Sequence, residues 1–118
     1  MHYLPDTVPE EAVDAIRPAF GRSDDQEPEV WIERCRNDLA QLWRLNDCWL
    51  ITEVRETKKG RAVHLLFIAG IYEPDIVDEA NAWARSLGCV RSYFTGRPGW
   101  VPKRPDYKLR TITMDKEL

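Results

Sequence analysis

The last third of the chain carries a cluster of cations that could bind an anionic partner. Between residues 91 and 110, six basic side chains are opposed by Asp106 alone. Proline fixes the torsion φ and lowers the entropy of the free chain, so we expect the stretch 96–105, with three prolines, to be a stiff arm. That arm would display Arg97, Trp100, Lys103 and Arg104, residue types that bind phosphates or anchor protein interfaces. Nucleic acid, a phosphate group or an acidic protein surface are all possible ligands.

The charge distribution leaves a second interpretation of the same arm. Residues 1–60 carry 13 acidic and 8 basic side chains, whereas residues 61–118 carry 7 and 9. The basic arm could therefore be a solvated face that is paired in part with the acidic N-terminal half.

The cysteines and histidines do not form a pattern suited to metal or disulfide chemistry. Cys35, Cys48 and Cys89 are widely spaced, no CxxC pair occurs, and the chain has two histidines. Such a set predicts neither a disulfide framework nor a zinc site. We expect Cys35 to be a small buried hydrophobe and His64 to be a core or edge residue of a strand.

Length and composition predict one domain, 1–118. The chain has 118 residues, of which 43% are hydrophobic and 31% charged, an ordinary balance for a globular domain. Its longest apolar run, residues 62–71, is far shorter than the roughly 20 residues of a membrane span. The first residues lack the basic start and apolar stretch of a signal peptide. We therefore expect a protein that contacts no membrane and is kept inside a cell or packaged from one.

The N-terminal half predicts a short edge strand and two helices. His2–Pro5 could be the strand, and Thr7 could cap a helix that Pro18 ends or kinks near Arg17. A second helix begins at Pro28. Its predicted buried face has spacings of four, four and three residues and consists of Trp31, Cys35, Leu39 and Leu42.

The C-terminal half predicts a hairpin, a helix and two more strands. After a turn at Asn46-Asp47, strands Cys48–Arg55 and Arg61–Ala69 flank a charged loop that ends at Gly60. The stretch Asp75–Leu87 has a helical apolar stripe and Gly88 follows as its stop signal. Cys89–Thr95 and Lys108–Met114 are the last two predicted strands.

This order of elements resembles the GNAT type of N-acetyltransferase over nearly the whole chain. Ser86-Leu87-Gly88-Cys89 looks like the helix exit of that family, and the stretch from Asp106-Tyr107-Lys108 to the terminal Met114-Asp115-Lys116-Glu117-Leu118 looks like the approach to its final strand. The resemblance implies an α+β fold in which helices flank a mixed, mostly antiparallel central sheet.

In that family the turn before the central helix has the form Q/R-x-x-G-x-G/A and holds the pyrophosphate of acetyl-CoA on backbone N–H groups. The corresponding turn here is Gly70-Ile71-Tyr72-Glu73-Pro74-Asp75, with one glycine, no basic residue and two carboxylates. Proline also removes one N–H donor. We therefore expect no cofactor to bind in the usual way.

The resemblance also indicates where catalytic groups would lie. Such transferases commonly use a glutamate or a water as base and a tyrosine as acid. Glu53 could point toward the sheet cleft, with Tyr107 or Tyr93 near it. The alternative is a solvent-facing Glu53 and a Tyr107 that only packs, and we prefer this structural interpretation to a catalytic one.

The string from Gly96 to Trp100 and the basic stretch after it also look like small GNAT-like proteins of tailed bacteriophages, some of which are virion components. This resemblance implies a non-catalytic protein of the host cytoplasm or the virion, acting through contacts with other phage structural proteins or with itself. Two alternatives remain: an active N-acetyltransferase with a variant acetyl-CoA turn, and a nucleic-acid-binding accessory protein that uses the basic arm.

Overall fold

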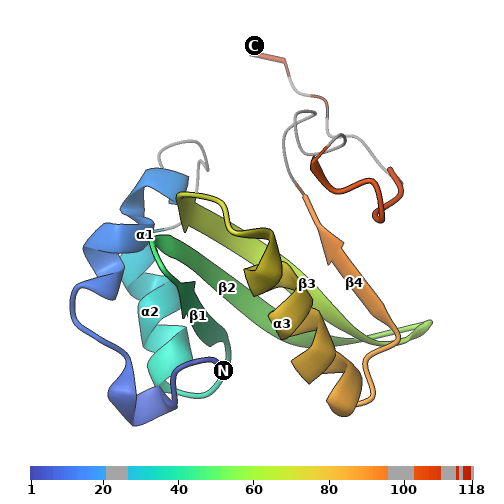
Figure 1. The fold of residues 1–118 in the computed structure, drawn as a ribbon, viewed down its shortest axis with the longest axis horizontal. Helices are drawn as coiled ribbons and strands as arrows, with labels where there is room; N and C mark the ends of the chain where they lie inside the picture. Colours follow the sequence, from blue (N-terminus) through green and yellow to red (C-terminus); the bar gives the residue numbers. More distant parts are fainter. Residues whose placement is uncertain (21–26, 96–102, 110–113, 115, 118) are drawn as a thin grey trace.

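The computed structural model describes residues 1–20, 27–95, 103–109, 114, 116 and 117 (Figure 1). The elements follow one another as η1 (Pro5–Thr7), α1 (Ala12–Phe20), α2 (Pro28–Arg36), β1 (Gln41–Leu45), β2 (Cys48–Thr57), β3 (Gly60–Gly70), α3 (Pro74–Ser86) and β4 (Arg91–Phe94). None of the helices in this part of the chain is long and apolar enough to cross a membrane.

The strands form one mixed sheet in the order β1-β2-β3-β4. The first three run antiparallel, joined by two-residue hairpin turns at 46–47 and 58–59, and both turns were predicted. Helix α3 then carries the chain back so that β4 pairs with β3 in parallel, because a parallel neighbour needs a crossover connection.

Strand β4 follows β3 for only part of its length. The register pairs Ala62–Leu65 with Arg91–Phe94, and the remaining residues of β3, up to Gly70, pair with no other described strand on that side. In Figure 1 the two strands start together and diverge toward their C-terminal ends. On its other edge β3 carries a bulge at Leu66, since Thr52 pairs with Leu65 and Ile51 pairs with Phe67.

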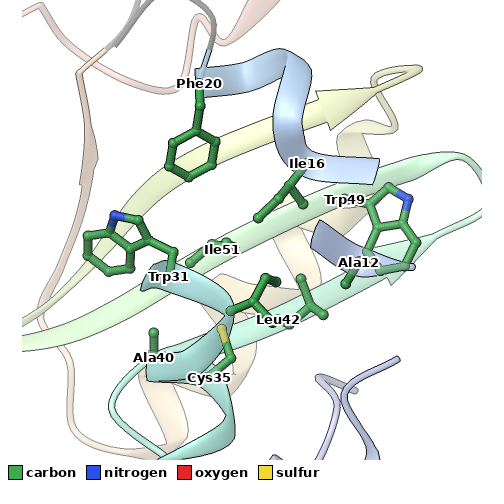
Figure 2. Packing of buried hydrophobic residues seen from close by; sticks show 10 residues of the cluster. Ala12, Ile16, Phe20, Trp31, Cys35, Ala40, Leu42, Trp49 and Ile51 are labelled. Atoms are coloured by element: carbon green, nitrogen blue, oxygen red, sulfur yellow. The ribbon is translucent and has the colours of Figure 1, made fainter. Parts of the chain in front are cut away.

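Helices cover both faces of the sheet. Figure 2 shows the first core, in which Ile16 and Phe20 of α1 and Trp31 of α2 pack over Leu42 and Ile51. The second core lies on the opposite face, because strand residues alternate between faces. There α3 packs its stripe over the strands; the buried members are Trp43, Cys48, Leu50, Val63, Leu65, Ile76, Val77, Ala80 and Ala84. Each large apolar side chain buried in this way contributes roughly 1.5–3 kcal/mol.

The first residues differ from the prediction. His2–Pro5 is not a strand: a single hydrogen bond, from Tyr3 N–H to the Leu42 carbonyl (2.8 Å), attaches it to β1. The Thr7 hydroxyl caps no helix, since it donates to the Leu4 carbonyl (2.9 Å) in η1. Pro18 does not end α1, which continues to Phe20; Pro18 lies in the last turn, on an exposed side where water can satisfy the backbone group it leaves unpaired.

The second helix is shorter than predicted. It ends at Arg36, and Asp38 takes a left-handed conformation (φ 59°) that turns the chain into the unpredicted strand β1. Leu39 is therefore 56% exposed, and Leu42 is buried as a strand residue instead of a helical one.

The C-terminal elements agree with the prediction where the structure describes them. Helix α3 matches the predicted Asp75–Leu87 to within a residue, and Gly88 has the left-handed conformation (φ 85°) expected after a helix. Strand β4 is the central part of the predicted Cys89–Thr95. The predicted strand Lys108–Met114 falls mostly outside the described residues.

Candidate functional site

The turn between β3 and α3 is held against the turn between β1 and β2. Gly70 has φ 88°, and a Cβ atom placed on it would lie 1.8 Å from the Asp47 carbonyl oxygen. The next residue, Ile71, donates its N–H to that same oxygen at 3.1 Å. The contact with Asp47 therefore explains the glycine without any ligand.

Acidic side chains lie at the start of α3. Glu73 is the residue before the helix, Pro74 is its first residue, and Asp75 follows in the first turn. The Glu73 carboxylate accepts a hydrogen bond from Asn46 Nδ2 at 3.3 Å, while Asp75 is exposed. Carboxylates stabilise the positive end of a helix dipole by about 0.3–1 kcal/mol each. The helix end that could attract an anion thus already carries two negative charges.

A row of polar side chains crosses three strands on the face covered by α1 and α2. Glu53 lies opposite His64, and His64 lies opposite Tyr93, whose ring stacks on the imidazole (centroids 4.4 Å apart, 8° between planes). The row lies one residue before Leu65 and Phe94, the last residues that pair between β3 and β4. Burial, and then the positive charge of Arg55, lower the pKa of His64 to about 4, so the imidazole is neutral at pH 7.

Glu53 is not solvent-facing, contrary to the structural interpretation of the sequence. It is 8% exposed, Arg34 Nη2 donates to its Oε2 at 3.0 Å, and Arg55 Nε donates to its Oε1. The hydrogen bond to Glu53 raises the pKa of Arg55. Both carboxylate oxygens are therefore occupied by guanidinium groups, so Glu53 is an ion-pairing residue in this structure.

Tyr107 lies on the other side of the sheet from Glu53. Its ring packs edge-on against Phe94 in the core under α3, and its hydroxyl contacts Asn81 Nδ2 (2.7 Å) and Ser92 Oγ (2.6 Å). The structure thus does not bring the two candidate catalytic residues together. Tyr93, the other tyrosine considered, is the one that shares a face with Glu53.

The basic arm is only partly described, and one of its cations is not displayed. Arg104 is 7% exposed, because its Nη2 contacts Asp78 Oδ1 of α3 (3.1 Å) and Asp106 Oδ2 (2.6 Å). Although burial opposes it, hydrogen bonding to Asp78 contributes to a raised pKa for Arg104. Lys103 is exposed, and Arg97 and Trp100 fall outside the described residues. Arg104 therefore ties its segment to α3 and is not displayed on the surface, contrary to the expectation for the arm.

A groove lies between α2 and β2, lined by Val30, Trp31, Arg34, Glu53 and Arg55, with a volume of about 300 Å³. Among the residues that the structure describes, no three metal-ligating side chains come together. His64 lies half-buried in β3, as predicted. Sequence reasoning missed the groove and the stacking of His64 on Tyr93, because the first depends on where α2 packs and the second on strand register.

No protein-family model matches the chain, and no curated protein matches it by sequence. Solved structures do match in shape. An aminoglycoside acetyltransferase from an uncultured soil metagenomic sample, in complex with trehalose, superposes with a TM-score of 0.70 at 8% identity, covering 100% of this chain and 94% of that one. A predicted acetyltransferase from Clostridium acetobutylicum, with acetyl-CoA, gives 0.66 at 12% identity (100% and 93% covered).

A third structure, described as a probable acetyltransferase, gives a TM-score of 0.63 at 14% identity and covers 98% of each chain. The neighbours are GNAT-type acetyltransferases, so the class defined by the fold is α+β and GNAT-like, as the order of elements predicted. At such low identity the likeness shows the fold alone, and one fold can serve many functions.

Proposed function

We propose that this protein is a non-catalytic member of the GNAT-like fold that acts through contacts with other proteins, in a phage particle or its assembly. The observation that carries the proposal is the acidic turn at the start of α3. The resemblance, mainly of residues 60–118, to small proteins of tailed bacteriophages supplies the suggested setting.

The turn does not fit the diphosphate of a coenzyme A thioester. Pro74 has no N–H to donate, and the N–H of Ile71 is already bonded to the Asp47 carbonyl. Glu73 and Asp75 would each oppose a bound diphosphate by on the order of 1 kcal/mol or more. The turn therefore supports no reaction step that depends on a coenzyme A thioester.

The two candidate catalytic residues, Glu53 and Tyr107, are engaged in holding the structure. Glu53 is bonded to two guanidinium groups, and the Tyr107 hydroxyl bridges α3 and β4 through Asn81 and Ser92. These contacts give both residues a structural reason to be present. They support a protein that keeps the transferase shape without its chemistry.

A second candidate is an active N-acetyltransferase with a variant acetyl-CoA turn. One observation favours it: the row Glu53–His64–Tyr93 lies beside the point where β3 and β4 separate, with a neutral imidazole at its centre. The neutral imidazole has a lone pair that can accept a proton, although a pKa of about 4 makes it a weak base. This candidate requires acetyl-CoA to bind despite the acidic turn.

A thermal-shift experiment separates the two candidates. Wild type and a Glu73→Gln/Asp75→Asn double variant are heated with and without 1 mM acetyl-CoA. We expect no stabilisation of the wild type and at most a small one in the double variant, because removing the two charges does not restore the missing N–H donors. Stabilisation of the wild type by more than about 2 °C would favour the enzyme instead.

The partner contact is tested by chemical cross-linking of purified particles that contain the protein, followed by mass spectrometry of the linked peptides. Links to other particle proteins are expected. Recovery of the protein only from the unassembled fraction, with no links, would contradict the proposal.

A further inference from the structure

We propose that the groove lined by Val30, Trp31, Arg34, Glu53 and Arg55, hereafter the arginine groove, docks a partner segment in which an acidic residue adjoins an apolar one. The inference rests on the proposed function, because it names the chemistry of the protein contact. It places that contact on residues of α2 and β2 and not on residues 96–105.

Glu53 fixes the two guanidinium groups of the groove. Arg34 reaches its Oε2 from α2, and Arg55 reaches its Oε1 from two residues along β2. The Arg34 guanidinium also lies over the ring of Trp31, with its Cζ 5.0 Å from the ring centroid. Both arginines are therefore held in one orientation before any ligand arrives, which lowers the entropy that binding must overcome.

The two arginines keep donors for a ligand. A guanidinium group carries five N–H donors, and each arginine spends a single nitrogen on Glu53. The Arg34 Nε is buried, so the donors left for a ligand are on the terminal nitrogens. The side chains of Arg34 and Arg55 are 38% and 46% exposed, so part of each group reaches solvent at the groove. Paired N–H donors of this kind bind a carboxylate in a bidentate fashion.

The charge of the groove matches a single negative charge. Two arginines and one glutamate leave a balance of +1 among the five lining residues. A carboxylate neutralises that balance, whereas a phosphate dianion would bring an excess charge close to Glu53. This match is our reason for choosing an acidic side chain over a phosphorylated one.

The remaining wall of the groove is apolar. Val30 is 53% exposed on α2, beside Trp31, which is buried beneath Arg34. An apolar residue next to the partner's carboxylate would cover Val30 as the carboxylate meets the arginines. A groove with one charged and one apolar side thus favours a partner segment with an acidic residue beside an apolar one. A segment with an acidic residue alone would leave Val30 uncovered.

The ion pairs that Glu53 forms with Arg34 and Arg55 contribute little to the stability of the fold. Partly exposed ion pairs are worth about 0–1 kcal/mol, and burying a carboxylate carries a desolvation cost of several kcal/mol. The structural role of Glu53 therefore leaves room for a second role of the two arginines, which is to bind the carboxylate of a partner.

The test is an NMR titration of the full chain at pH 7 with three blocked tripeptides. Each has leucine at both ends, with glutamate, glutamine or phosphoserine in the middle. We expect the glutamate peptide to shift the Trp31 indole N–H and the Arg34 and Arg55 Nε–H signals with millimolar affinity, and the glutamine peptide to bind at least fivefold more weakly. Equal binding of those two peptides, or tenfold tighter binding of the phosphoserine peptide, would overturn the inference.

Two variants locate the site. Val30→Glu places a carboxylate at the exposed wall and should weaken the glutamate peptide at least fivefold, while Arg44→Gln, an exposed arginine of β1, should leave it unchanged. Unchanged binding by Val30→Glu together with weaker binding by Arg44→Gln would also overturn the inference. These titrations do not involve acetyl-CoA, so a failure here is distinct from a failure of the proposed function.

Discussion

Replacing Gly70 with alanine tests whether the glycine of the β3–α3 turn is structural. The added Cβ would lie 1.8 Å from the Asp47 carbonyl oxygen, where real contacts exceed about 3 Å, so one of the two turns must move. That movement breaks the hydrogen bond from Ile71 N–H to Asp47, which is worth about 0.5–1.5 kcal/mol. Alanine at φ 88° costs about 1–2 kcal/mol more.

These effects predict a loss of about 3 kcal/mol in the free energy of unfolding. Gly88→Ala is the matched control, because Gly88 has nearly the same φ (85°) but no atom within 4 Å of the added Cβ. That variant should lose only the torsional cost of about 1–2 kcal/mol. Any difference between the two variants therefore reports the contact with Asp47 and not the backbone torsion.

Urea unfolding followed by tryptophan fluorescence measures both variants, and thermal unfolding gives a second reading at about 4 °C per kcal/mol for a chain of this length. The reasoning is refuted if Gly70→Ala loses less than about 1 kcal/mol, or no more than Gly88→Ala. In that case the glycine would need another explanation, and a ligand at the turn would be the first to consider.

Three further changes test other parts of the structure. Thr52→Val should cost about 2–3 kcal/mol in urea unfolding, because the buried hydroxyl links the Trp43 indole N–H and the Gln41 side chain; a loss under about 0.5 kcal/mol would contradict this. The pKa of His64 is lowered to about 4. Between pH 6.5 and pH 4, the free energy of unfolding should therefore fall by about 1–2 kcal/mol more in the wild type than in His64→Phe, after allowance for solvent screening. Parallel pH profiles of the two proteins would contradict this. Neutral His64 is the form that stabilises the fold, so its contribution to the free energy of unfolding is complete above pH 6.5 and is lost on acidification. Arg104→Met should lower the melting temperature by about 4–8 °C through loss of the ties to Asp78 and Asp106, and an unchanged melting temperature would show that those ties contribute nothing.

The sequence was most informative where local signals agree with one another. The apolar stripe of α3 and the glycine after it are enough to predict the helix, and a short charged loop between two apolar runs is enough to predict the β2–β3 hairpin. The boundary between α2 and β1 could not be predicted. Leu39 and Leu42 continue the helical spacing, and only the left-handed turn at Asp38, stabilised in the folded chain, ends it.

The candidate site depends on relations that no local signal contains. Glu53 faces His64 because the β2–β3 turn consists of residues 58–59 alone, which is shorter than the predicted loop 56–60. His64 faces Tyr93 because α3 returns the chain to the same edge. Arg104 was expected on the surface because its neighbours are cationic. Its burial depends on Asp78, which is 26 positions away in sequence.

The most direct test of the central claim is isothermal titration calorimetry of the wild-type protein with acetyl-CoA. Two carboxylates and a missing donor at the start of α3 predict no saturable heat up to 1 mM cofactor, under conditions where the protein remains folded. A saturable signal with a dissociation constant below about 100 μM would correspond to more than about 5 kcal/mol of binding free energy. It would show that the GNAT-like fold has kept its cofactor site, in contradiction of the proposed function.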